Sequence, residues 1–247
     1  VISNPHDLYP LAVEREEFIL GESLRQGREQ GLVEFRIVQH ATTDGINHAM
    51  RSFRPHVFHF VGHGQFDNDT AFLALENSRG AAHLVEESLF QEFFADEQDT
   101  RLVVLNACQS ATISTSRPLV GIAPRLLQRH IPAVVAMRNP ISDQAAIIFT
   151  REFYRSLVAG YPVDASIAHA RKEIYQSVGH SPSDWSAPVL FLRSRDGVLF
   201  QIESPVIDRG TRASTVETGG GAHIGGDVTV DRDFVGRDQI SRTTTYN

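Results

Sequence analysis

One short apolar segment constrains the fold of this chain more than any other feature. Residues 101–107, RLVVLNA, are almost all apolar, which is typical of a central parallel strand covered by helices on both faces. Similar runs at 56–62 (HVFHFVG) and 131–137 (IPAVVAM) are separated from it by longer patterns of helical period. Because such units join parallel strands through right-handed crossovers, we expect an α/β fold, a three-layer sandwich with a mostly parallel central sheet.

The rest of the chain supplies further strands, the covering helices and a tail of different composition. We expect strands at 33–39, 71–77 and 187–194, and helices at 11–30, 42–53, 84–95, 118–130, 142–159 and 162–178. After Ser204 the composition shifts to Gly, Thr, Asp and Arg, which is typical of a linker. We therefore expect one α/β domain over 1–203 and a glycine-rich linker and tail over 204–247. Within the tail, IGGDV (224–228) and VGRDQ (235–239) suggest short β-repeats.

The charge balance and the lack of long apolar runs limit the partners of the chain. The formal net charge is -7, with 23 Lys and Arg against 30 Asp and Glu. Since phosphate-backbone binding needs clustered cations, we expect no nucleic-acid partner. No segment reaches the roughly 18–20 apolar residues that span a bilayer, and no signal segment opens the chain, so we expect a cytoplasmic protein without membrane contact. Lys172 is the only lysine, a bias typical of GC-rich bacterial genomes, and the strand-like opening VIS without a Met indicates a piece of a longer polypeptide.

Three polar segments follow the apolar strands, at the end where ligands bind in parallel α/β sheets. They are 62–64 (GHG), 106–110 (NACQS) and 142–143 (SD). If the three strands are neighbours, an imidazole, a thiol and a carboxylate face one cleft. Cys108 is the only cysteine, so the chain forms no internal disulfide and no multi-thiolate metal site, and this residue is either a buried filler or a reactive thiol.

The pair His63 and Cys108 has the chemistry of a thiol hydrolase site. Attack of a cysteine on an acyl carbon requires a thiolate, a proton donor for the leaving group, and hydrogen-bond donors at the developing oxyanion. Cys108 supplies the nucleophile and His63 shuttles the proton. The flanking glycines leave the backbone uncluttered, so the N–H of Gly64 can serve as an oxyanion donor together with the N–H of Cys108.

Each of these residues also has a purely structural explanation. A single cysteine after a buried strand is more often a small core residue than a nucleophile, and GHG (62–64) can be a simple turn. His59 and His63 can share one strand face, but the sequence offers no clear third ligand for a zinc site. His59 is more simply a hydrogen-bonded core histidine. Asp143 can be the N-cap of the helix that it begins.

The order of GHG (62–64) and NACQS (106–110), each at the end of an apolar strand, resembles the caspase-like cysteine peptidases and in particular the CHAT family. The similarity includes SNP near the start, HFVGHG, LVVLNACQSA, the long stretch from GIAPRLL to ASIAHAR and the closing DWSAPVLFL. It covers nearly all of residues 1–195. The resemblance implies a caspase-like sandwich, endopeptidase activity on protein substrates, and His63 and Cys108 as the catalytic dyad.

The resemblance also implies a substrate pocket. In related peptidases, acidic residues in the region of 142–143 help to form the S1 pocket, so Asp143 is expected to bind substrate. We also expect Asn106, in the polar segment 106–110, to bind substrate. Many relatives carry an aromatic residue where this chain has Arg-Asn-Pro at 138–140, which changes the wall of the pocket.

Together these features predict a regulated bacterial cysteine endopeptidase that cleaves protein substrates after a basic residue, under the control of an upstream sensor or recruitment domain. No cofactor and no metal is expected. The alternative is a catalytically silent caspase-like interaction module in a signalling or defence complex, but the presence of both His63 and Cys108 favours the enzyme. A nucleotide-binding flavodoxin-like domain is disfavoured, because neither G-x-x-x-x-G-K-[ST] nor G-x-G-x-x-G follows a strand.

Overall fold

The structure is a computed structural model that describes most of the chain up to residue 202. The described residues are 1–67, 70–96, 98–107, 118–139, 141–179 and 182–202. The predicted nucleophile Cys108 and the predicted tail 204–247 lie outside them, so the domain boundary near residue 203 stays a prediction.

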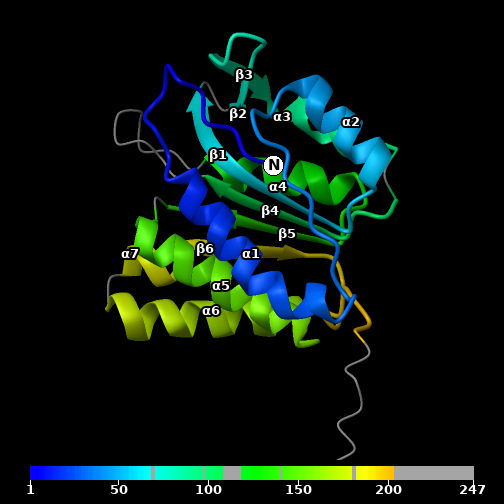
Figure 1. The fold of residues 1–247 in the computed structure, drawn as a ribbon, viewed down its shortest axis with the longest axis vertical. Coiled ribbons are helices and arrows are strands. Elements are labelled where there is room, and N and C mark those ends of the chain that lie inside the picture. The colour runs from blue at the N-terminus through cyan, green and yellow to red at the C-terminus, as the bar shows by residue number, and fades with distance from the viewer. Residues whose placement is uncertain (68–69, 97, 108–117, 140, 180–181, 203–247) are drawn as a thin grey trace, which may run out of the picture. The chain divides into compact units, whose positions relative to one another are not determined.

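A six-stranded mixed sheet forms the centre of the described fold (Figure 1), in the order β3-β2-β1-β4-β5-β6. The strands are β1 (Val57–Asp67), β2 (Thr70–Glu76), β3 (Ala82–Glu86), β4 (Leu102–Ala107), β5 (Ala133–Met137) and β6 (Pro188–Leu192). The three strands expected to be neighbours, β1, β4 and β5, are parallel neighbours. The expectation of a mostly parallel sheet is wrong, because three of the five strand pairings are antiparallel.

Short connections explain two of the antiparallel pairings. Only two residues separate Asp67 from Thr70, and five separate Glu76 from Ala82. A parallel connection needs a crossover of about a dozen residues or more, so links this short can only form hairpins. The expected helix over 84–95 overlapped β3, and this overlap hid the second hairpin from the sequence pattern.

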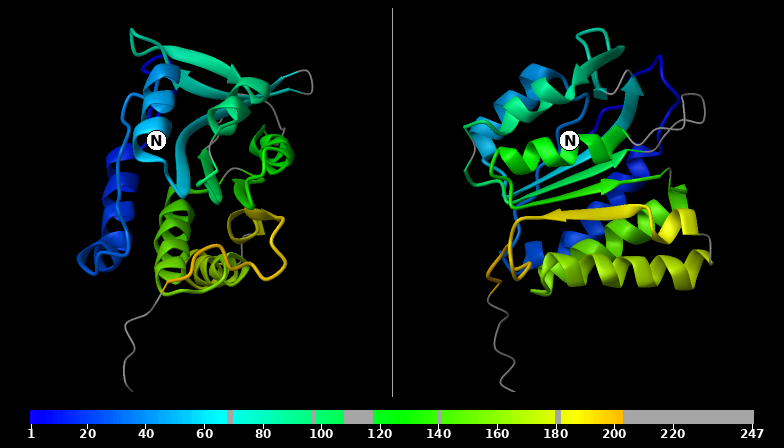
Figure 2. Two further views of the ribbon diagram at one scale, coloured as in Figure 1. Left: turned by 90° about the vertical axis from the view of Figure 1, so that its right-hand side faces the viewer. Right: turned by 180° about the vertical axis from the view of Figure 1, so that it is seen from behind.

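Helices cover both faces of the sheet (Figures 1 and 2). They are α1 (Val13–Glu29), α2 (Thr43–Phe53), α3 (Glu87–Phe90), the 3-10 helix η1 (Gln91–Phe94), α4 (Pro118–Gln128), α5 (Asp143–Val158), α6 (Val163–Val178) and α7 (Pro182–Trp185). Helices α1, α5 and α6 supply one apolar cluster with one face of the central strands, and α2, α3, η1 and α4 supply the other. None of the helices in these ranges is long and apolar enough to cross a membrane.

The alternation of side chains along β4 shows why this strand is so apolar. Leu102 and Val104 point into the cluster of α1, α5 and α6, whereas Val103 and Leu105 point into the opposite cluster, and all four are fully buried. Burying such a side chain contributes about 1.5–3 kcal/mol relative to leaving it exposed. A strand covered on both faces therefore has no position for a polar residue until it reaches its carboxyl end.

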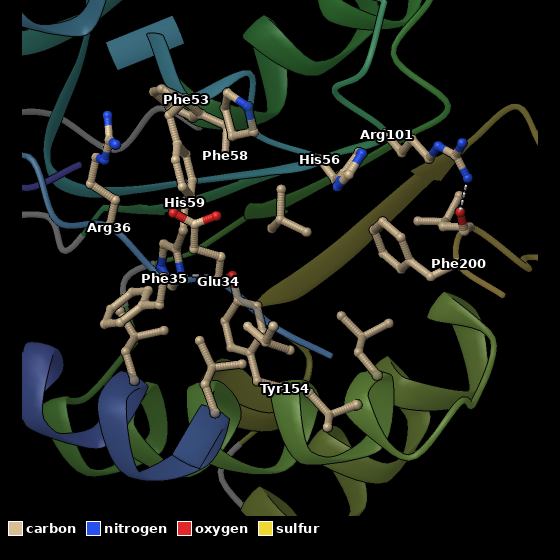
Figure 3. Close-up of a pocket in the computed structure, with 18 of the residues that line it drawn as sticks. Glu34, Phe35, Arg36, Phe53, His56, Phe58, His59, Arg101, Tyr154 and Phe200 are labelled. Atoms are coloured by element: carbon tan, nitrogen blue, oxygen red, sulfur yellow. Dashed lines mark hydrogen bonds between the residues drawn. The ribbon is translucent and has the colours of Figure 1, made fainter. Parts of the chain in front are cut away.

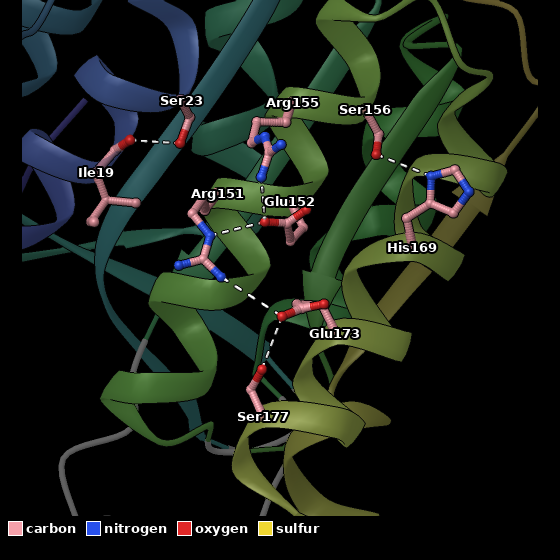
Figure 4. Close-up of polar contacts among 9 residues, drawn as sticks. All are labelled: Ile19, Ser23, Arg151, Glu152, Arg155, Ser156, His169, Glu173 and Ser177. Carbon is pink, nitrogen blue, oxygen red and sulfur yellow. Dashed lines mark hydrogen bonds and ion pairs between the residues drawn. The ribbon is translucent and has the colours of Figure 1, made fainter.

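The outer contacts of α5 are polar but contribute little to stability (Figure 4). Arg151 and Arg155 both pair with Glu152, at 2.9 and 3.1 Å, and Arg151 lies 4.0 Å from Glu173 of α6. Partly exposed ion pairs of this kind are worth about 0–1 kcal/mol each. The apolar residues that α5 and α6 share with the sheet therefore hold this layer in place.

Candidate active site

His63 lies where β1 exchanges one neighbour for another. Residues 57–62 of β1 pair in parallel with β4, ending at the pair Gly62 and Ala107. From His63 onward, β1 pairs antiparallel with β2, beginning at the pair His63 and Ala74. The segment 62–64 is thus extended strand and not a simple turn.

The imidazole of His63 is buried, and burial favours its neutral form. The residue is 5% exposed. Desolvation by burial lowers the pKa of His63, and a hydrogen bond with the backbone of Tyr9 opposes that shift. Within the described part of the chain, its Nε2 has no hydrogen-bond partner. A neutral imidazole with one unengaged nitrogen has the form that proton transfer requires.

Gly62 brings β1 close to its own Phe60 side chain. A Cβ at this position would overlap the Phe60 ring, lying 2.8 Å from Cε1, and that ring is fully buried. We expect Gly62→Ala to lower the free energy of unfolding by about 1–3 kcal/mol, because the ring must leave its packed position. Gly21→Ala in α1, where the new methyl meets open space, should instead be neutral or raise it by up to about 1 kcal/mol. Urea denaturation of both variants checks this, and equal midpoints would contradict the assigned packing.

The side chain of Asn106 leaves the end of β4 toward α1 and not toward open solvent. Asn106 is 2% exposed, and its Nδ2 donates to Oε1 of Glu16, which is itself 8% exposed. Thr150 of α5 donates to the same oxygen at 3.1 Å. Two neutral donors therefore hold a buried carboxyl group directly behind the end of β4.

The carboxyl group of Glu16 lacks a positive partner among the residues described. Desolvation by burial raises its pKa, the hydrogen bonds from Thr150 and Asn106 act in the opposite direction, and the charge of Asp143 raises it further. Asp143 follows β5, and its charge acts on Glu16, which is bonded to Asn106 at the end of β4. Glu16 and Asp143 are therefore two acidic groups in one region, at the carboxyl ends of β4 and β5.

The structure assigns the helix cap to Ser142 and leaves Asp143 exposed. Ser142 Oγ accepts from the N–H of Ala145 at 3.3 Å, and the Ser142 N–H donates to Asp184 at 3.0 Å. Asp143 is the first residue of α5, not its N-cap. Arg138, which the resemblance places in the wall of the expected substrate pocket, lies 3.4 Å from Ser186 Oγ.

Replacing Glu16 should change how stability depends on pH. A raised pKa means that the folded state keeps a proton that the unfolded state loses, so this group lowers stability progressively as pH rises above its ordinary value of 4.5. We expect Glu16→Gln, which can still accept both hydrogen bonds, to gain stability over the wild type as pH rises from 4.5 into the neutral range. Glu16→Ala should cost about 1–3 kcal/mol, because the buried Asn106 amide loses its acceptor.

Thermal unfolding across this pH range measures both effects. Glu14→Gln is the matched control, since Glu14 lies in the same helix and is exposed. A difference between wild type and Glu16→Gln that stays constant with pH would show that Glu16 does not keep its proton on folding.

Sequence reasoning did not identify Glu16 as a site residue. The signal was present, because Glu16 occupies a core position of α1, together with Leu20, Ser23, Leu24 and Gly27. A carboxylate on the buried stripe of an amphipathic helix needs a partner inside the protein. The sequence does not show which strand end provides that partner.

His59 is a hydrogen-bonded histidine of the core, as expected from the sequence. Its Nδ1 lies 2.9 Å from the hydroxyl of Tyr154 (Figure 3), and burial lowers its pKa to about 3. Among the described residues, no three His, Cys, Asp or Glu side chains are arranged to hold a metal ion.

These observations define an α/β domain in which a histidine lies where β1 stops pairing with β4 and starts pairing with β2. Polar side chains lie at the carboxyl ends of β4 and β5. The profile of the CHAT domain matches residues 1–193. The chain therefore belongs to the CHAT domain family, a family of caspase-like cysteine peptidase-related domains. A comparison with curated proteins found no significant match.

Proposed function

We propose that this chain is a regulated bacterial cysteine endopeptidase in which His63 and Cys108 form the catalytic dyad. The observation that carries the proposal is the register of β1 and β4. Gly62 and Ala107 are paired, and they immediately precede His63 and Cys108 in the sequence. Neighbouring strands lie about 4.8 Å apart, and consecutive Cα atoms lie about 3.8 Å apart. His63 and Cys108 are therefore each one residue beyond a pair of residues that lie side by side in the sheet.

The direction of the backbone groups along β1 supports Gly64 as an oxyanion donor. The N–H and C=O of Val61 both bond to residues 1 and 3, on the side away from β4. Because these groups alternate in direction along a strand, the N–H of Gly64 points to the side of β4, beyond Ala107. A donor there complements the N–H of Cys108 around one substrate carbonyl.

The acidic groups near the strand ends favour a basic residue before the cleaved bond. Asp143 is exposed, and Glu16 lies buried within its electrostatic influence. An arginine or lysine side chain entering this region compensates both carboxylates, and arginine can do so with bidentate geometry. The buried position of Asn106 favours a role in holding Glu16 over direct contact with substrate.

The proposal extends to the setting of the domain. It includes the caspase-like sandwich arrangement, protein substrates, a cytoplasmic location, and control by a sensor or recruitment region joined to this chain. Residues 204–247 act in this proposal as a linker and tail that hydrolysis does not need.

A thiol-directed peptide probe tests the proposal against the silent-module alternative. A peptidyl acyloxymethyl ketone with arginine next to the warhead should label the full chain once, at Cys108, as seen by mass spectrometry. Labelling should disappear in Cys108→Ala and fall strongly in His63→Ala, whereas exposed His48→Ala should label normally. Equal modification of wild type and His63→Ala would favour the silent interaction module.

A further inference from the structure

The 4–11 loop, which precedes α1 (Figure 1), is held against the hairpin of β2 and β3. Asp7 of the loop accepts a hydrogen bond from the N–H of Ala82, the first residue of β3, at 2.7 Å. The two ends of the loop are joined to each other, because the N–H of Leu11 donates to Asn4 Oδ1 at 3.1 Å. The backbone of this loop is therefore fixed relative to the sheet.

Tyr9 connects this loop to His63 and leaves its own ring mostly uncovered. The backbone of Tyr9 is hydrogen-bonded to the imidazole of His63. Since Nε2 of His63 has no partner within the described ranges, this bond engages the other ring nitrogen, Nδ1. The Tyr9 residue is 70% exposed. A large aromatic ring that is held beside a reactive group and left in solvent is available for contact with a ligand.

Leu84 is a second exposed apolar residue on the face of the sheet to which His63 points. His63 is paired with Ala74 of β2, and Ala74 is paired with Leu84 of β3. Directly paired residues of antiparallel strands point to the same face, so Leu84 shares the face of His63 and lies two strands away. Its neighbour Val85 points into the buried cluster of the opposite face, whereas Leu84 is 45% exposed.

The order of the strands gives the proposed site two sides. His63 is on β1, with β4 and β5 on one side and β2 and β3 on the other. Cys108 and Asp143 follow β4 and β5 in the sequence, so the acyl half of a substrate, which the thiol attacks, lies on their side. His63 transfers the thiol proton to the nitrogen of the breaking C–N bond. That nitrogen belongs to the residue after the cleaved bond, so the leaving half lies on the side of β2 and β3.

We propose that the substrate residues after the cleaved bond bind over the hairpin of β2 and β3, where Tyr9 and Leu84 select large apolar side chains. This inference rests on the proposed function, because it uses the direction of proton transfer from His63. Neighbouring strands lie about 4.8 Å apart, so Leu84 is about 10 Å from His63 across the sheet. An extended peptide covers that distance with about three residues at 3.3 Å each. The preferred substrate therefore has a basic residue before the cleaved bond and apolar residues among the three after it.

Cleavage of three substrates by the full chain tests this selectivity. Two are internally quenched peptides that are identical up to an arginine, which is followed by Leu-Leu-Leu in one and by Ser-Ser-Ser in the other. The third carries a fluorescent amine directly after the arginine and has no residue beyond the cleaved bond. The wild type should cleave the leucine peptide with a kcat/KM at least about tenfold higher than the serine peptide. Tyr9→Ala and Leu84→Ser should each lower this ratio at least about threefold, and kcat/KM for the third substrate should stay within about twofold.

Two residues of the same types and similar exposure give matched controls. Tyr161 is 52% exposed in the link between α5 and α6, and Leu89 is 46% exposed in α3, in the layer on the opposite face of the sheet. Tyr161→Ala and Leu89→Ser should keep the wild-type ratio. An unchanged ratio in Tyr9→Ala or in Leu84→Ser, or equal cleavage of both peptides by the wild type, would overturn this inference and leave the proposed function standing. If the wild type cleaves none of the three substrates, the proposed function fails and this inference fails with it.

Discussion

Cys108→Ala and His63→Ala are each expected to lower kcat/KM for peptide hydrolysis by at least about a thousandfold. One variant removes the nucleophile and the other removes the group that transfers its proton. The double variant should be no slower than the slower single variant, because residues that act as a unit do not contribute additively. Steady-state hydrolysis of a fluorogenic peptide with arginine before the cleaved bond measures all three.

Stability and matched variants separate chemistry from folding in this experiment. His48→Ala removes an exposed histidine of α2 and should leave kcat/KM unchanged. The Cys108→Ala chain should unfold at nearly the wild-type temperature, since only one sulfur atom is lost. Wild-type turnover by purified Cys108→Ala would show that the dyad is assigned to the wrong residue.

Asp143→Asn is expected to remove the preference for arginine before the cleaved bond. Hydrolysis after arginine should fall by about 30–100-fold, because the substrate cation loses its exposed partner, whereas hydrolysis after leucine should stay within about twofold. A peptide panel that varies only this residue provides the measurement. Asp44→Asn is the control, since Asp44 is an exposed carboxylate in the first turn of α2.

The peptide panel also distinguishes the roles of Asp143 and Glu16. If Asp143→Asn keeps its preference for arginine and Glu16→Gln loses it, the buried carboxyl group is the one that recognises substrate. If the wild-type enzyme cleaves after leucine but never after arginine or lysine, the basic preference is wrong for either residue.

The parts of the fold that follow from local pattern were predictable. The strand expected at 101–107 is β4, and the helix expected at 142–159 is α5, because a continuous apolar run and a 3.6-residue period each need only their own residues. The direction of the outer strands was not predictable in the same way. For β2 and β3 it depends on two consecutive hairpins, and the last strand of the second hairpin, β3, has a short and mixed sequence.

In the candidate site, too, the residues marked by local sequence pattern were predictable and those that depend on tertiary packing were not. His63 and Asn106 were found because polar residues interrupt apolar strands at their ends. The partner of Asn106 could not be found, since Glu16 lies 90 residues away in the chain and only tertiary packing brings it there. The strand expected at 33–39 failed for a related reason, because its pattern is that of a strand but pairing also needs a neighbour.

The exchange of neighbours along β1 has a consequence for the order in which the molecule folds. The pairing with β2 joins residues close together in the sequence and closes a small loop, whereas the pairing with β4 joins Gly62 to Ala107, 45 positions apart. Closing the longer loop costs more chain entropy, so the hairpin can form first and the parallel ladder afterwards. A nascent chain with only its hairpin formed holds His63 in place without bringing the segment before Cys108 beside it. The proposed peptidase therefore stays inactive during its own synthesis until the middle of the sheet has assembled.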